Sequence, residues 1–289
     1  RDEAISSPPP RKEAISGHLI TMSAASSGKR VVIKIGTGVL TRNSGGEIHH
    51  AMIARLSQAI SDINAAGHEV IMVSSGAVGA GMSAFGLTQR PAGIEMLQAC
   101  AAAGQARLMH LYEGQFSLHG IKVAQLLVTH DDLQDERRSS NVLATLNAIL
   151  PHRQVIPIMN ENDSVSVYEL KVGDNDTLSS IVARLVKADL LILLTSVAGL
   201  MGPEAASPDD IIPEVDEIES VLSFVRDEKG DLSVGGMASK LRAVEAAVNS
   251  GIETIIASGL HPEQLPELVE GRGVGTRFRV KAAALPATT

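Results

Sequence analysis

Short apolar runs alternate with longer amphipathic segments from residue 29 onward. Segments such as residues 51–66, 177–187 and 237–250 repeat apolar residues at helical spacing and predict helices. The apolar runs are rich in Val, Ile and Leu and predict strands over residues 31–35, 69–74, 121–128, 155–159, 190–194 and 253–257. This alternation predicts an α/β fold, a three-layer α/β/α sandwich around a mainly parallel sheet.

The same pattern predicts the organisation of the chain. We expect one folded domain over residues 29–280, preceded by a polar, Ser/Pro-rich flexible leader over residues 1–28 and followed by a short tail over residues 281–289. Residues 202–214 and 226–234 predict exposed loops. The long segment 93–119 predicts either an assembly surface or a flexible cover over a site.

Composition excludes several classes of partner. The formal net charge is −8, Trp is absent and Tyr and Phe together number six, so we expect no nucleic-acid partner. The single cysteine, Cys100, lies in an apolar stretch and has no second cysteine to pair with. No apolar run is long enough for a membrane span, and the N-terminus lacks the apolar core of a secretory signal, so we expect a cytoplasmic protein without a membrane partner.

A dense polar segment, residues 160–176, follows the predicted strand 155–159. Ligands of open α/β sheets bind at the carboxyl ends of the strands, so this segment predicts a binding site. Helix capping is the ordinary explanation for the aspartates at its end, but it does not explain the whole cluster. The cluster includes Asn160, Asn162, Asp163, Asp174, Asn175 and Asp176.

Lys34 interrupts the first apolar strand on the face opposite to Ile33 and Ile35. A buried ammonium group is costly unless it meets an anion, and Gly36 and Gly38 just after the strand let backbone N–H groups approach phosphate closely. The alternative is a solvated lysine on an edge strand.

The turn after the second strand reads Ser75-Gly76-Ala77 and leads into a helix, whose N-terminus suits a carboxylate or phosphate. The alternative is an ordinary capping serine. Residues Gly79, Gly81 and Ala84 match the spacing of a dinucleotide fingerprint, but they lie inside the predicted helix rather than at the turn.

Lys240 lies in the first turn of a predicted helix after Gly235 and Gly236, where a cation opposes the helix dipole and a bound anion would compensate it. A solvated lysine is the alternative. Together with Lys34 and the polar segment 160–176, Lys240 indicates a site that binds phosphate beside a charged small molecule. The histidines lack the spacing of metal ligands, so we expect no metal held by protein side chains.

Five motifs, in this order, closely resemble the glutamate 5-kinases of the amino acid kinase family over residues 31–278. They are Lys34-Ile35-Gly36-Thr37, Ser74-Ser75-Gly76-Ala77, Asn160-Glu161-Asn162-Asp163, Lys171-Val172-Gly173-Asp174-Asn175-Asp176 and Gly235-Gly236-Met237-Ala238-Ser239-Lys240.

The resemblance implies ATP-dependent phosphorylation of the γ-carboxylate of L-glutamate, the first step of proline synthesis, with Mg²⁺ accompanying ATP. It implies a homo-oligomer, a dimer or tetramer, and inhibition by proline. The residues implied to bind glutamate are Ser75, Gly76, Ala77, Asp163, Asp174 and Asn175. Those implied to act in catalysis are Lys34, Lys240 and Asp176, with Asp176 holding the two lysines. Those implied to line the nucleotide are Lys34, Gly36, Thr37, Gly38, Thr195, Ser196, Gly235, Gly236, Met237 and Lys240.

The chain departs from the family pattern in three places. Thr195-Ser196 stands where relatives usually carry Thr-Asp, and Ser233-Val234 stands where Gly-Thr is frequent. The C-terminal PUA domain of many bacterial relatives is absent from the sequence. Two alternatives stay open, namely another acceptor within the family, such as aspartate or acetylglutamate, and a catalytically weak regulatory protein that binds glutamate or proline.

Overall fold

The protein is described by a computed structural model that covers residues 28–42, 47–166, 175–207, 210–226 and 236–280. Nearly all of the predicted leader, the predicted tail, and the site residues Asp174 and Gly235 lie outside the described residues. The described part includes every predicted strand.

The described strands form one eight-stranded sheet in the order β3-β4-β2-β1-β5-β7-β8-β6. Neighbouring strands are parallel except for the antiparallel pair β7 and β8, which confirms the predicted mainly parallel α/β fold. The strands are β1 (Arg30–Ile35), β2 (Glu69–Ser74), β3 (Lys122–Val128), β4 (Val155–Glu161), β5 (Leu190–Thr195), β6 (Glu214–Val215), β7 (Glu253–Ser258) and β8 (Thr276–Phe278).

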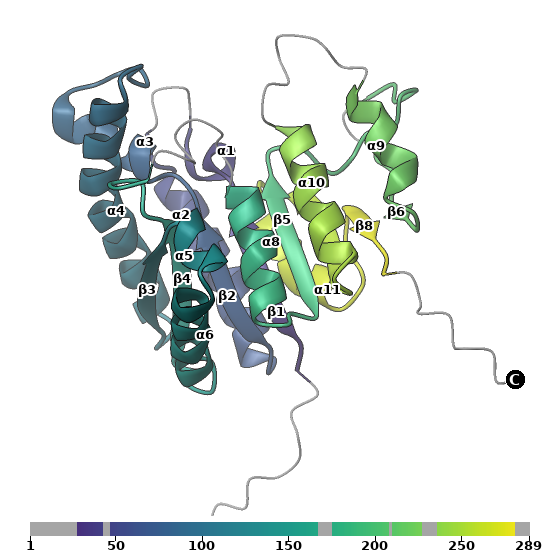
Figure 1. Ribbon diagram of the computed structural model, residues 1–289, viewed down its shortest axis with the longest axis horizontal. Helices are drawn as coiled ribbons and strands as arrows, with labels where there is room; N and C mark the ends of the chain where they lie inside the picture. Colours follow the sequence, from purple (N-terminus) through teal and green to yellow (C-terminus); the bar gives the residue numbers. More distant parts are fainter. Residues whose placement is uncertain (1–27, 43–46, 167–174, 208–209, 227–235, 281–289) are drawn as a thin grey trace, which may run out of the picture.

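Helices cover both faces of this sheet and complete the three layers (Figure 1). One face is covered mainly by α2 (His50–Ala65), α4 (Ile94–Ser117) and α11 (Leu265–Val269). The other is covered by α5 (His130–Gln134), α6 (Glu136–Ile149), α8 (Asn175–Leu185), α9 (Glu219–Arg226) and α10 (Met237–Val248). The shorter elements are α1 (Thr37–Leu40), α3 (Ala77–Met82) and the 3-10 turns η1 (Ser83–Phe85) and η2 (Pro262–Gln264).

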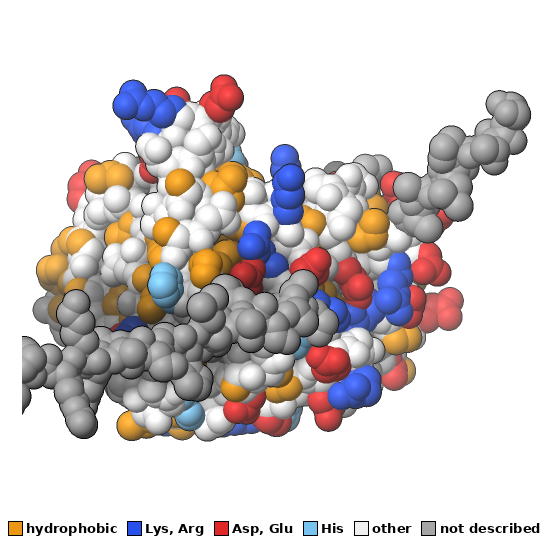
Figure 2. Space-filling view, turned by 90° about the horizontal axis from the view of Figure 1, so that it is seen from below, with side chains coloured by type: hydrophobic (Ala, Val, Ile, Leu, Met, Phe, Trp, Pro, Cys, Tyr) orange, Lys and Arg blue, Asp and Glu red, His pale blue; other side chains and the backbone are white. Residues whose placement is uncertain are grey.

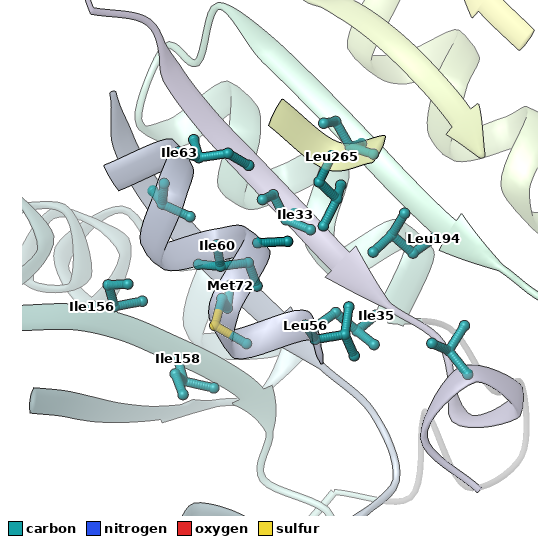
Figure 3. Packing of buried hydrophobic residues seen from close by; sticks show 14 of the residues in the cluster. Ile33, Ile35, Leu56, Ile60, Ile63, Met72, Ile156, Ile158, Leu194 and Leu265 are labelled. Atoms are coloured by element: carbon teal, nitrogen blue, oxygen red, sulfur yellow. The ribbon is translucent and has the colours of Figure 1, made fainter. Parts of the chain in front are cut away.

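Strand β1 lies inside the sheet and contributes to both cores. Ile33 and Ile35 pack with Leu56 and Ile60 of α2 and Leu265 of α11 in the first core (Figure 3). Residues of a strand alternate between faces, so Lys34 points toward the second core, on the side of α8 and α10. Since β1 pairs with both β2 and β5, the interpretation of Lys34 as a solvated residue on an edge strand is wrong.

Helices α3 and α4 approach each other so closely that only glycine fits at the crossing. A β carbon on Gly104 would lie 1.8 Å from the carbonyl oxygen of Ala77, and one on Gly81 would lie 1.9 Å from that of Cys100. Gly79 and Gly81 do lie inside α3, as predicted, and Gly81 serves this contact. Because α4 is a 24-residue helix that packs on α2 and α3, the segment 93–119 is not a flexible cover.

The surface mixes charges of both signs. On the face seen in Figure 2, acidic and basic side chains lie interspersed among apolar ones. None of the helices in the described ranges combines the length and the apolar character that a membrane crossing requires.

We expect Gly104→Ala to lower the free energy of unfolding by about 1–3 kcal/mol, because the added methyl group pushes the Ala77 carbonyl and α3 away from α4. Gly114→Ala, in the same helix, is the matched control, since a β carbon there meets no atom within 4 Å. The control should be stabilised by up to about 1 kcal/mol, because alanine is the better helix former. Urea unfolding of both variants measures the difference, and equal changes in the two would contradict the close contact.

Candidate active site

One carboxylate bridges two lysines at the carboxyl ends of the central strands. Asp176, in the first turn of α8, lies 2.7 Å from Nζ of Lys34 on β1 and 3.0 Å from Nζ of Lys240 on α10. The three side chains are only 3%, 6% and 12% exposed, respectively. The cluster carries two positive charges and one negative charge, so it keeps a net charge of about +1 for a bound anion.

Asp176 is held in its ionised form. Burial acts to raise the pKa of its carboxyl group, but the charges of Lys34 and Lys240 and their hydrogen bonds outweigh burial and keep the pKa below its usual value. Lys240 is held from a second side as well, because its Nζ donates to the carbonyl oxygen of Gly236 at 3.3 Å. The two ammonium groups are therefore fixed in place.

A cavity of about 350 Å³ opens beside this cluster. It gathers most of the predicted site residues, which come from segments far apart in the chain. Those that line it are Lys34, Gly36, Thr37, Gly38, Ser75, Gly76, Ala77, Asp163, Asp176, Thr195, Ser196, Gly236 and Lys240. Two of the predicted site residues within the described ranges do not line it. Asn175 lies behind Ser75 and donates to its hydroxyl group, while Met237 packs against the second core.

Two glycines shape the cavity wall. Gly76 has φ of +99°, a conformation that favours glycine, and it turns β2 into α3 with Leu40 packed against it. Gly36 follows β1, and its N–H donates to the carbonyl oxygen of Leu194 at 3.2 Å. The backbones after β1 and β2 therefore stay close to the space that a ligand would fill.

Asp163, in the turn after β4, presents a buried carboxylate to the same cavity. Its Oδ1 accepts no hydrogen bond from any described residue. Burial and, next, the charge of Glu161 raise the pKa of Asp163 to about 7, while the charge of Arg90 acts in the opposite direction. The carboxylate would be stabilised by a ligand that brings a positive charge and hydrogen-bond donors.

A network of amides fixes the orientation of Asn175. Its Nδ2 donates to the carbonyl oxygen of Ser74 at 3.2 Å, and to Oγ of Ser75 and Oδ1 of Asn160 at 2.9 Å each. Asn160 Oδ1 also accepts from the backbone N–H of Glu161, which can only donate. Asn175 Oδ1 is thus turned away from the network, is buried, and has no partner among the described residues. It is a second unpartnered acceptor near Ser75.

Two residues of this region were missed by the sequence analysis. Gln105 on α4 accepts a hydrogen bond from Nδ2 of Asn160 at 2.9 Å, and Arg90, between η1 and α4, lines the cavity. Gln105 carries a signal that could have found it, because it is a buried polar residue in the apolar stripe with Ala101, Leu108 and Tyr112. Arg90 carries none, since a single arginine in a loop is ordinary in any sequence.

The family is decided by comparison with known sequences. A model of the Amino acid kinase family matches residues 29–258, most of the chain. The chain belongs to the amino acid kinase family. The matched region holds Lys34, Asp163, Asp176 and Lys240, so the cavity described above lies within the family domain.

Within this family, the chain is similar to curated glutamate 5-kinases. It is 44% identical to the glutamate 5-kinase of Clostridium tetani over 253 residues, which are 86% of this chain and 94% of that protein. It is also 44% identical to the glutamate 5-kinase of Moorella thermoacetica over 258 residues, which are 88% of this chain and 68% of that protein.

A solved structure of the same fold is the carbamate kinase from Giardia lamblia bound to citric acid. The TM-score is 0.61 at 17% sequence identity, and the match covers 88% of this chain and 99% of that chain. At this identity the likeness supports the amino acid kinase fold and nothing finer.

We expect Asp176→Ala to lower the free energy of unfolding by about 3–5 kcal/mol, because it leaves two buried ammonium groups without their anion. Since the folded-state pKa is lowered, the wild type should lose the same contribution as the pH falls below the unfolded value of about 3.9.

The control for this experiment is Glu263→Ala, which removes an exposed ion pair with Arg55. Its urea midpoint at pH 7 should equal that of the wild type within error. An Asp176→Ala midpoint that also equals the wild-type value would show that the bridge does not stabilise the fold.

Proposed function

We propose that this chain is an ATP-dependent kinase that transfers the γ-phosphoryl group of ATP to the γ-carboxylate of L-glutamate. The product is γ-glutamyl phosphate, the first intermediate of proline synthesis. The observation that carries the proposal is one cavity that joins a bridged pair of lysines to a buried carboxylate whose Oδ1 has no partner among the described residues. The glutamate 5-kinases of similar sequence support the choice of acceptor.

The Asp163 end of the cavity suits the amino acid. An ammonium group has three donors and one positive charge, which fits the carboxylate of Asp163, whose Oδ1 has no partner among the described residues; Asn175, behind Ser75, is assigned to the amino acid from the resemblance. Ser75 and the first backbone N–H groups of α3, at Gly76 and Ala77, lie beside them and can position a carboxylate. Asp174 is assigned to the same subsite from the resemblance, although it lies outside the described residues.

The lysine end suits the phosphates. Lys34 and Lys240 would contact the transferring phosphoryl group, and Asp176 would keep both lysines in place. The nucleotide would lie along Gly36, Thr37 and Gly38 after β1, along Thr195 and Ser196 after β5, and along Gly236 before α10. Gly235 and Met237 are assigned to the nucleotide from the resemblance alone.

Mg²⁺ would arrive with ATP as part of the substrate. It prefers phosphate oxygens and water with one or two carboxylates, and it brings positive charge to the β- and γ-phosphates. Asp176 is already paired with both lysines, so we expect the phosphates and water to supply most of the ligands.

The reaction needs no general base. The γ-carboxylate of glutamate, with a pKa of about 4.3, is ionised at neutral pH and can attack the γ-phosphorus directly. A P–O bond forms to the carboxylate while the bond from the γ-phosphorus to the β,γ-bridging oxygen breaks, and ADP leaves. The main barrier is repulsion between anions, which fixed ammonium groups offset most strongly as charge spreads in the transition state.

Three other expectations remain predictions. They are assembly into a dimer or tetramer, inhibition by proline and a cytoplasmic location. Ser196 lines the cavity where relatives usually carry aspartate, so nucleotide preference is the property most open to change.

Trapping of the acyl phosphate tests the function. With Mg-ATP and hydroxylamine, the purified chain should form a hydroxamate from glutamate much faster than from aspartate, N-acetylglutamate or UMP. Competition with other nucleotides then measures donor preference. Binding of glutamate by calorimetry without any hydroxamate would reject the kinase in favour of a regulatory protein.

We expect kcat/KM for glutamate, at saturating Mg-ATP, to rise with pH through a pKa of about 7 in the free enzyme. Below that pH, Asp163 is protonated and accepts the ammonium group poorly. Asp163→Asn should remove this inflection and lower kcat/KM by about 10–100-fold, the loss of one charge-assisted hydrogen bond. An inflection that persists in the variant would show that another group titrates.

A further inference from the structure

The proposed substrate carries three charged groups, and two of them already have charged partners among the described residues of the cavity. Asp163 suits the α-ammonium group, while Lys34 and Lys240 suit the γ-carboxylate and the phosphoryl group it receives. The α-carboxylate has no assigned cation. The inference below concerns that group and rests on the proposed function.

Arg90 is a third cation on the cavity wall. It lies in the loop between η1 and α4 and lines the same cavity as Ser75 and Asp163. Its side chain is exposed, and within the described part of the chain its guanidinium group makes no ion pair or hydrogen bond. A guanidinium group presents several N–H donors in a planar fork that matches a carboxylate.

The charges of the cavity are divided between two ends. Lys34 and Lys240 act on the carboxylate of Asp176, whereas Arg90 is the cation that acts on Asp163. The α-carboxylate and the α-ammonium group of an amino acid share one carbon atom, so their partners must be neighbours. Arg90, at the Asp163 end, is therefore placed for the α-carboxylate, and the lysines are placed for the other end of the molecule.

We propose that Arg90 binds the α-carboxylate of the acceptor and thereby selects α-amino dicarboxylic acids over analogues that lack the α-carboxylate. Arg90 and Asp163 form a zwitterion clamp, defined as these two side chains, which matches the two charges on the α-carbon. The acceptor binds Arg90 through its α-carboxylate and Asp163 through its ammonium group. These two contacts orient it so that its γ-carboxylate points toward Lys34 and Lys240.

Three compounds distinguish the contributions of the charged groups of the substrate to binding. Glutamate carries all three charged groups, 4-aminobutyrate lacks the α-carboxylate, and glutarate lacks the ammonium group. The test compares the wild type with Arg90→Gln, which removes the charge, and with Arg90→Lys, which keeps it. Hydroxamate formation gives kcat and KM for glutamate and Mg-ATP, and inhibition of that reaction gives the affinity for each analogue.

Arg90→Gln should raise the KM for glutamate about tenfold or more and leave the KM for Mg-ATP unchanged. Its affinity for glutarate, which retains a carboxylate that can occupy the Arg90 position, should fall, but its affinity for 4-aminobutyrate should not. Arg90→Lys should restore part of the glutamate affinity. Arg107→Gln is the matched control, because Arg107 is an exposed arginine on α4 that does not line the cavity, and its KM values should equal those of the wild type.

An unchanged KM for glutamate in Arg90→Gln would overturn the assignment, as would an equal loss of affinity for 4-aminobutyrate. Either result, with an active wild type, leaves the proposed function standing. If the wild type forms no hydroxamate from glutamate, the proposed function fails and the role of Arg90 fails with it.

Discussion

The ion cluster of Asp176 with Lys34 and Lys240 is the constraint on which the site depends. Two ammonium groups that contact the same carboxylate repel each other, and in a buried position that repulsion is strong. A single carboxylate from a third element makes the arrangement stable while leaving a net positive charge. The positively charged lysine end of the cavity therefore exists before any ligand binds, which is the condition for electrostatic stabilisation without reorganisation.

The parallel sheet explains how these groups meet. Strand β1 pairs with β2 and β5, so the loops after all three strands lie at one edge of the sheet. Alternation along β1 sends Ile33 and Ile35 into one core and Lys34 toward the helices of the other face. The same alternation that builds the hydrophobic core thus delivers the catalytic candidate to α8 and α10.

Much of this arrangement was predictable, because it rests on local patterns. The apolar runs predicted six strands whose ends lie within one or two residues of the observed ends. The isolated charge of Lys34 in such a run predicted that it meets an anion, which is Asp176. Strand β4 extends two residues further than predicted, to Glu161, because Asn160 and Glu161 pair with Leu127 and Val128 of β3. The short strands β6 and β8 lack enough residues for any period to show.

The contacts that sequence could not supply join residues far apart in the chain. Gln105 reaches Asn160 across 55 positions, and Asn175 reaches Ser75 across 100. No spacing rule connects them, since they meet only after α4 and α8 have packed on opposite faces of the sheet. Arg90 is the extreme case, because only the folded structure shows that this arginine lines the cavity.

The two charged ends of the cavity differ in how firmly the fold holds them. The lysine end is built from the sheet and from helices that the core holds rigidly, so it tolerates little change. Arg90 stands on a surface loop in which no residue from positions 86 to 93 is fully buried, and only Leu87 of these packs, partly buried, against a small hydrophobic cluster. A change in that loop can therefore alter the Arg90 side of the cavity without disturbing the bridged lysines.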